Sequence, residues 1–187
     1  MFDRLKAKLR QKKTANRLKK HMADAEGSTI QRGAVAIVMV TLEDDVVQEQ
    51  KMELTVHEQQ VFLMTYGCMV LWYLLRGFAS GGMTEHEQAN VVMAVKRHLE
   101  KESWYASDLF ERLWKQTQIW MPQLGVPAED GKFFPLAALV QIVSASGCQG
   151  GCVTSYSFGV HIIYKIPAWV EFGKATAKLE DGHPASS

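Results

Sequence analysis

Residues 61–75 read Val-Phe-Leu-Met-Thr-Tyr-Gly-Cys-Met-Val-Leu-Trp-Tyr-Leu-Leu, fifteen consecutive positions without a charged side chain. Thr55 and Glu58 precede this run with the spacing of a capping box, which predicts that a helix begins there. A helix that is apolar on every side lies either at the centre of a domain or in a subunit interface. The run is shorter than the roughly 20 residues that a membrane span needs, so we expect a core or interface helix.

Three further segments follow the apolar run towards the C-terminus. Residues 77–82 contain glycines that should end the first helix, and Thr84 with Glu87 forms a second capping box. The apolar stripe that follows predicts an amphipathic helix up to Leu99. Another helix is expected from Ser107 to a stop at Pro122, and a short apolar helix or strand over residues 136–145.

Strands are expected on both sides of these helices. Residues 34–42 are rich in β-branched side chains and predict a strand buried on both faces. A partner strand is expected over residues 46–56, because residues 51–56 alternate between polar and apolar positions, and Glu43-Asp44-Asp45 supplies the turn between the two. Residues 153–166 alternate as well. The sequence therefore predicts an α+β fold, with a small antiparallel sheet packed against three or four helices and an all-helical bundle as the alternative.

Length and composition fit one globular domain. The chain has 187 residues, of which 47% are hydrophobic, so it can bury a substantial core. We expect a basic arm and linker over residues 1–32, a globular domain over residues 33–173 and a flexible tail over residues 174–187.

Three cysteines, an odd number, favour a reducing compartment, so we predict a cytoplasmic protein.

The charge of the chain is divided unevenly between its start and the remainder. Residues 1–21 carry nine basic side chains and one acidic side chain, a net charge of +8, whereas the remaining residues carry a net charge of −7. A cationic arm on an anionic body predicts either docking of the arm on its own body or a separate anionic partner. The nine basic residues are Arg4, Lys6, Lys8, Arg10, Lys12, Lys13, Arg17, Lys19 and Lys20.

The arm is expected to form a helix over about residues 2–22, because it contains good helix formers and no glycine or proline. At about 100° per residue, Phe2, Leu5 and Leu9 cluster on one side of this helix. Leu18 and Met22 fall on nearly the opposite side. An anionic membrane surface, including the inner membrane face, and nucleic acid phosphates fit the arm almost equally well as partners.

Few residues suggest chemistry. Cys148 and Cys152 flank a glycine-rich stretch, and His161 follows them, so a thiol or metal site is the most site-like combination. The spacing of the two thiols differs from the Cys-x-x-Cys of redox and zinc motifs, and no nucleophile elbow or phosphate-binding loop is present in the sequence. We predict no cofactor and no small-molecule substrate.

These observations favour a non-enzymatic adaptor or assembly protein. Its basic arm is expected to contact an anionic partner, and its apolar segment at residues 61–75 a protein partner or a second copy of the chain. A small enzyme or a thiol- or metal-dependent protein that uses the loop from Gly147 to Cys152 is the alternative. A subunit of a larger machine is a third possibility.

Overall fold

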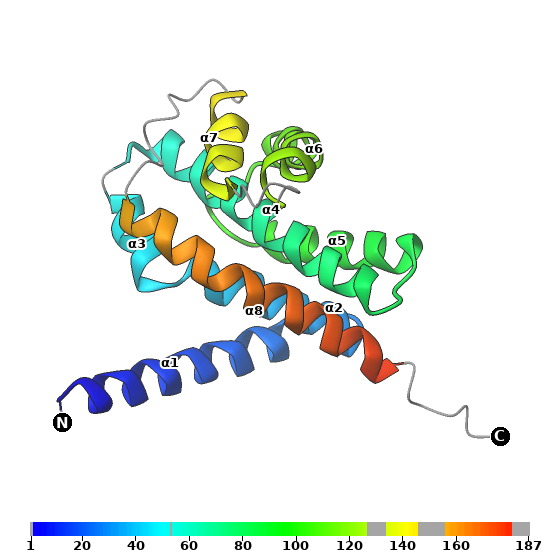
Figure 1. Cartoon of the computed structure of the whole chain (residues 1–187), viewed down its shortest axis with the longest axis horizontal. Coiled ribbons are helices and arrows are strands. Elements are labelled where there is room, and N and C mark those ends of the chain that lie inside the picture. The colour runs from blue at the N-terminus through cyan, green and yellow to red at the C-terminus, as the bar shows by residue number, and fades with distance from the viewer. Residues whose placement is uncertain (1, 53, 127–133, 146–155, 181–187) are drawn as a thin grey trace.

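The computed structural model describes residues 2–52, 54–126, 134–145 and 156–180, with the side chains of residues 2–10, 156–160, 179 and 180 outside the description. The described residues form eight α-helices and contain no strand (Figure 1). The helices are α1 (Phe2–Asp24), α2 (Thr29–Leu42), α3 (Asp45–Met52), α4 (Val56–Ser80), α5 (Glu85–Leu99), α6 (Ser107–Leu124), α7 (Pro135–Ala145) and α8 (Tyr156–Glu180).

The predicted α+β fold is wrong, and the all-helical alternative agrees with the structure. Residues 34–42 lie inside α2, residues 46–56 cover most of α3 and reach the start of α4, and residues 156–166 form the first turns of α8. A short run that is apolar at every position carries no period. Burial on all sides of a helix therefore gives the same sequence pattern as burial on both faces of a strand.

The helix α2 begins at a capping box. The hydroxyl of Ser28 accepts a hydrogen bond from the backbone N–H of Gln31 at 3.3 Å, and the Gln31 side chain accepts one from the backbone N–H of Ser28 at 2.8 Å. Nine of the fourteen residues of α2 are buried. The free energy gained by burying that many residues outweighs the helix propensity of the β-branched residues, each of which disfavours a helix by a few tenths of a kcal/mol.

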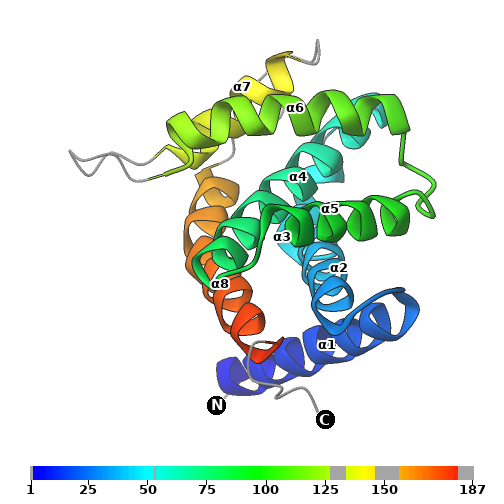
Figure 2. The same cartoon turned by 90° about the vertical axis from the view of Figure 1, so that its right-hand side faces the viewer.

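The apolar run lies in α4, at the centre of the bundle. The capping box of Thr55 and Glu58 is confirmed, with the backbone N–H of Thr55 donating to the Glu58 carboxylate at 2.9 Å. Every residue from Val61 to Leu71 is buried. The helices α2, α3, α5, α6, α7 and α8 pack around α4 (Figures 1 and 2), and α8 makes the most extensive contact.

Among the described helices, α4 alone is long and apolar enough to cross a membrane. Within the bundle, however, 83% of its apolar window is buried. The core helix of a globular protein passes the same test of length and composition, so the burial shows that α4 is the core helix of this fold.

Two glycines let α4 and α8 approach until their backbones touch. A methyl group added at Gly77 would lie 3.0 Å from the Cα of Gly173, and one added at Gly173 would lie 3.1 Å from the Cα of Gly77. Around this crossing, α8 buries Ile166, Trp169 and Ala177 at helical spacing. The pair of glycines therefore sets how closely the two longest helices pack.

The predicted helix ends are less accurate than the predicted helices. The capping box of Thr84 and Glu87 is confirmed at the start of α5, and α4 ends at Ser80, inside the predicted stretch 77–82, with Gly81 as its C-cap. Pro122 does not stop α6, which ends at Leu124, and Pro167 lies within α8. Proline removes one backbone donor from a helix and does not always end it, because surrounding contacts can hold the remaining turns.

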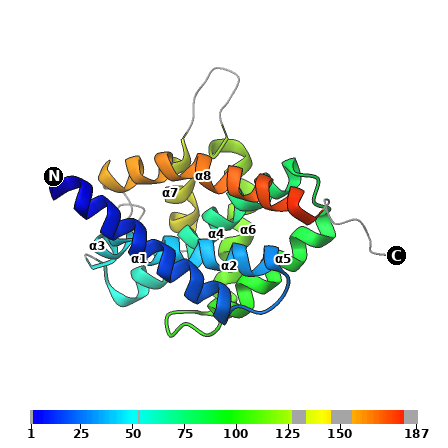
Figure 3. The ribbon, with the colours of Figure 1, turned by 90° about the horizontal axis from the view of Figure 1, so that it is seen from below.

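The basic arm forms one continuous helix on the outside of the bundle. α1 packs mainly against α2, and in Figure 3 it crosses the near side of the molecule, with most of the bundle behind it. The expected domain boundaries at residues 33 and 174 fall inside α2 and α8. The linker predicted up to residue 32 is thus short, because residues 29–32 already belong to the first turn of α2.

Candidate functional site

The described part of α1 has one face against the body and one face away from it. His21 and Ala25 are buried, and Leu18 and Met22 are half-buried, all against the bundle. The opposite face is exposed and carries lysines. Leu18 and Met22, one of the two apolar groups that the sequence placed on opposite sides of the arm, therefore lie on the docked face.

An acidic turn lies where α1 crosses the end of α2. We use this name for Glu43, Asp44 and Asp45, which join α2 to α3. The carboxylate of Asp44 accepts a hydrogen bond from the backbone N–H of Val46 at 3.1 Å, and Gln48 donates to the backbone carbonyl of Leu42 at 2.6 Å. These bonds fix the first turn of α3 and hold three neighbouring carboxylates close to α1.

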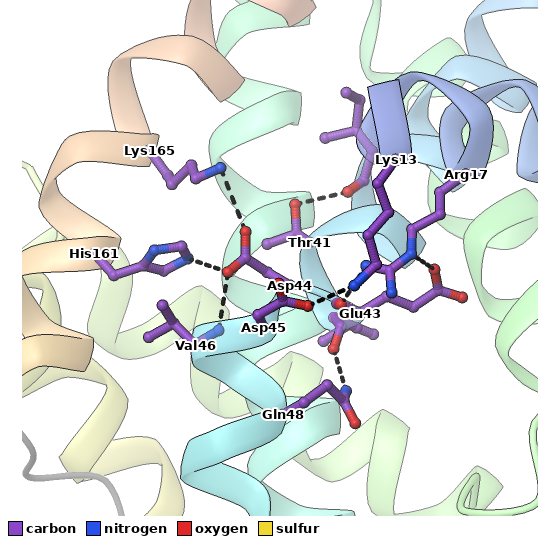
Figure 4. Close-up of polar contacts among 12 residues, drawn as sticks. Lys13, Arg17, Thr41, Glu43, Asp44, Asp45, Val46, Gln48, His161 and Lys165 are labelled. Atoms are coloured by element: carbon purple, nitrogen blue, oxygen red, sulfur yellow. Dashed lines mark hydrogen bonds and ion pairs between the residues drawn. The ribbon is translucent and has the colours of Figure 1, made fainter. Parts of the chain in front are cut away.

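Cations of α1 bind this acidic turn (Figure 4). Arg17 donates to the backbone carbonyl of Glu43 at 2.6 Å, and its Nε lies 3.3 Å from the Glu43 carboxylate. The Nε2 of His21 lies 3.0 Å from the same carboxylate, and Lys13 binds Asp45 at 3.0 Å. The Lys13 pair is more than half exposed on both sides and contributes at most about 1 kcal/mol. Glu43 is therefore the principal docking point of α1.

The acidic turn is also bound from α8. The Nε2 of His161 lies 3.8 Å from the Asp44 carboxylate, and the Nζ of Lys165 lies 3.6 Å from it (Figure 4). Burial lowers the pKa of His161. The negative charge of Asp44 acts in the opposite direction and raises this pKa, whereas the positive charge of Lys165 lowers it further. The acidic turn thus joins α1 and α8, two helices that are distant in sequence.

A cleft of about 730 Å³ opens between these elements. Its polar lining includes Lys13, Arg17, Asp44, Glu49 and Lys165, and its apolar lining comes from short stretches of α1, α2 and α3. Cations and carboxylates alternate around it and several of them pair with each other, so the cleft has no single charge that would select a ligand. Within the described residues, no three His, Cys, Asp or Glu side chains gather as a metal site would require.

His21 of α1 contacts His98 of α5. The rings of His21 and His98 lie edge to face, with their centroids 6.0 Å apart. Burial lowers the pKa of His98, and the neighbouring His21 lowers it further. His98 is only 9% exposed, although it lies beside Lys96 and Arg97 in the amphipathic helix α5. This burial follows from the docking of α1 on α5 and α2, which the pattern of α5 alone does not show.

The nine predicted basic residues divide into three groups. Lys13 and Arg17 are bound to the acidic turn. Lys12, Lys19 and Lys20 are exposed, and no described residue forms an ion pair with them. Arg4, Lys6, Lys8 and Arg10 belong to the helix α1, and their side chains lie outside the described part. The arm therefore uses only some of its described cations for docking.

The predicted thiol or metal site stays a prediction, because two of its three residues are not among the described residues. Cys148 and Cys152 lie outside them, and His161 pairs with Asp44. The described cysteine, Cys68, is buried in α4, and burial raises the pKa of its thiol. A buried, protonated thiol is neither a good nucleophile nor a metal ligand.

Sequence reasoning assigned the acidic turn only to a turn and missed its role in holding α1. The opposite charges of arm and body were the available signal, and they suggested self-docking without naming the residues. His21 gave no signal, because its burial depends on contacts with distant parts of the chain.

No protein-family model, curated protein or solved structure matches the chain in sequence or fold.

Proposed function

We propose that this protein is a non-enzymatic adaptor or assembly protein that contacts an anionic partner through the outer face of α1. The docked face of α1 fixes the helix to the body at Glu43, and the opposite face offers positive charge to the partner. The helix thus acts as a rigid, surface-mounted contact element and not as a loose tail.

One observation carries this proposal. Lys12, Lys19 and Lys20 are exposed on α1 and form no ion pair with any described residue, although the body next to them is rich in carboxylates. Unpaired cations on one face of a helix attract an anionic surface without first breaking contacts within the protein. Arg17 and His21, in contrast, are committed to Glu43.

The expected strength follows from the number of cations. Each lysine near an anionic membrane contributes about 1 kcal/mol, so the three unpaired lysines supply about 3 kcal/mol, or about a 100-fold change in affinity. Binding to nucleic acid phosphates would show the same dependence on these lysines and a steep loss with salt.

The test compares two charge-matched variants of the full chain. Lys12, Lys19 and Lys20 are changed to Gln in the first, and Lys101, Lys115 and Lys178, which are exposed on the body, are changed to Gln in the second. Binding to vesicles that contain phosphatidylserine and to double-stranded DNA is measured at about 50 and about 200 mM salt. We expect the first variant to lose most binding and the second to retain it. Equal losses in both variants, or no binding by the unmodified chain, would refute the proposal.

The body is proposed to supply the protein contact of the adaptor, or self-association. The apolar run at residues 61–75 is not that contact surface, because most of it is buried in the core. Light scattering after gel filtration tests self-association against the chain mass of 21.0 kDa. A mass at or above twice this value supports self-association. The mass of a monomer would leave a different protein as the partner that the body contacts.

A further inference from the structure

We infer that the anionic partner of α1 is the surface of a lipid bilayer, into which the apolar first turns of the helix insert. This inference rests on the proposed function, because it names the partner of the same outer face. It is argued from the register of α1 and from the charges along that register.

A single stripe runs along α1 from its first turn to its last. The helix is continuous from Phe2 to Asp24. Positions spaced by three and four residues lie on one face of a helix. Seven positions with this spacing form what we call the outward stripe: Phe2, Leu5, Leu9, Lys12, Asn16, Lys19 and Ala23.

The outward stripe lies opposite the docked face. At about 100° per residue, its positions centre about half a turn away from Leu18, His21 and Ala25. The described members of the stripe, Lys12, Asn16, Lys19 and Ala23, are all exposed. Because the helix is continuous, the register places positions 2, 5 and 9 on this same outward face.

Charge follows the same division. Lys20 lies beside the stripe and is exposed, so the outward face from Lys12 onward holds three lysines that form no ion pair with any described residue. The acidic residue of the first turn, Asp3, falls at the register of His21 on the docked side. The outward face therefore combines an apolar beginning with a cationic continuation and carries no acidic position.

This combination distinguishes lipid from nucleic acid. A helix that lies in a membrane interface buries its apolar residues at the boundary of the acyl chains, while its lysines meet the anionic headgroups. One such signal alone gives weak attachment, whereas apolar insertion and a basic patch together give stable attachment. Nucleic acid phosphates attract the lysines alone, and three apolar positions on the contact face contribute nothing to that binding.

The placement of α1 allows this contact. In Figure 3 the helix crosses the near side of the molecule, and most of the bundle lies behind it. Figure 1 shows α1 along one margin of the bundle, with its N-terminal end extending away from α8. A flat surface can therefore meet the outward stripe along its length while α1 stays docked.

The test uses the full chain with Leu5→Ala and Leu9→Ala together, which keep helix propensity, and Leu18→Ala on the docked face as the control. Partition into phosphatidylserine vesicles and affinity for double-stranded DNA are measured for each. We expect the double variant to lose vesicle partition by about tenfold or more and to keep its affinity for DNA, with the control within about twofold of the unmodified chain.

The outcomes separate this inference from the proposed function. No binding to vesicles or DNA by the unmodified chain refutes the proposed function itself. Binding to DNA without partition into vesicles leaves the proposed function standing and overturns the lipid inference. Vesicle partition unchanged in the double variant, or equal losses for vesicles and DNA, also overturns it, because the apolar positions then do not insert.

Discussion

Replacement of Gly77 by Ala tests the close packing of α4 against α8. The new methyl group would lie 3.0 Å from the Cα of Gly173 and 3.0 Å from the backbone nitrogen of Lys174, and closer still to the carbonyl oxygen of Val170. All three are backbone atoms, which cannot rotate away as a side chain can, so the helices must separate. Overpacking of this kind costs up to about 3 kcal/mol. The better helix propensity of alanine returns about 1 kcal/mol, which leaves a net loss of about 2 kcal/mol.

Gly67 in the same helix supplies the control. It is also buried, but a methyl group added there would lie 3.6 Å from the nearest side-chain atom of Leu42, an ordinary contact. Gly67→Ala should therefore raise the free energy of unfolding by up to about 1 kcal/mol. Denaturant unfolding of both variants should show a difference of about 3 kcal/mol between them. Equal stabilities would refute the packing of α4 against α8 described above.

Three further perturbations address the docking of α1 and the buried groups. Glu43→Ala removes the carboxylate that pairs with Arg17 and with buried His21, so we expect α1 amides to exchange with solvent about 10- to 100-fold faster, and Glu43→Gln to have a smaller effect. The lowered pKa of His98 means that the unfolded chain binds its proton more readily. The corresponding stability is present above about pH 6.5 and is lost as the pH falls below it, so unfolding curves of His98→Gln should depend less on pH than those of exposed His57→Gln. The Cys68 thiol should resist alkylation in the native protein and react after denaturation, as peptide mass spectrometry can show; rapid native labelling would contradict its burial.

Local signals in the sequence predicted the helices best. The capping boxes at Thr55 and Thr84 each involve residues three apart, and both are present in the structure. A third box, Ser28 with Gln31, was equally visible and would have predicted the start of α2. The β-branched residues that follow this box favour a strand and therefore compete with its signal.

The strands were predicted wrongly because burial in this bundle depends on contacts between distant helices. α2 is covered by α1, α4 and α5, so its apolar residues face protein on most sides and show no helical period. The alternation at residues 51–56 spans the end of α3 and the connection to α4, which are separate elements. An alternating pattern that crosses a helix boundary carries no information about a strand.

The candidate site could be predicted in its charge but not in its geometry. The excess of cations in residues 1–21 was evident from the sequence, as was the split between Leu9 and Leu18 on opposite sides of the arm. Which cations dock depends on where α2 ends, because the acidic turn lies beside α1 only in the folded bundle. The division into bound Arg17 and unpaired Lys19 therefore required the structure.

Hydrogen exchange of the full chain with and without phosphatidylserine vesicles tests most directly whether α1 stays docked while its outer face binds lipid. The account predicts that vesicles slow exchange in the first half of α1, over residues 2–12, and leave exchange at the acidic turn unchanged. Unchanged exchange throughout α1 would contradict membrane contact. Faster exchange at Glu43 to Asp45 on addition of vesicles would show that lipid pulls the helix away from the body, against the two-faced arrangement proposed for α1.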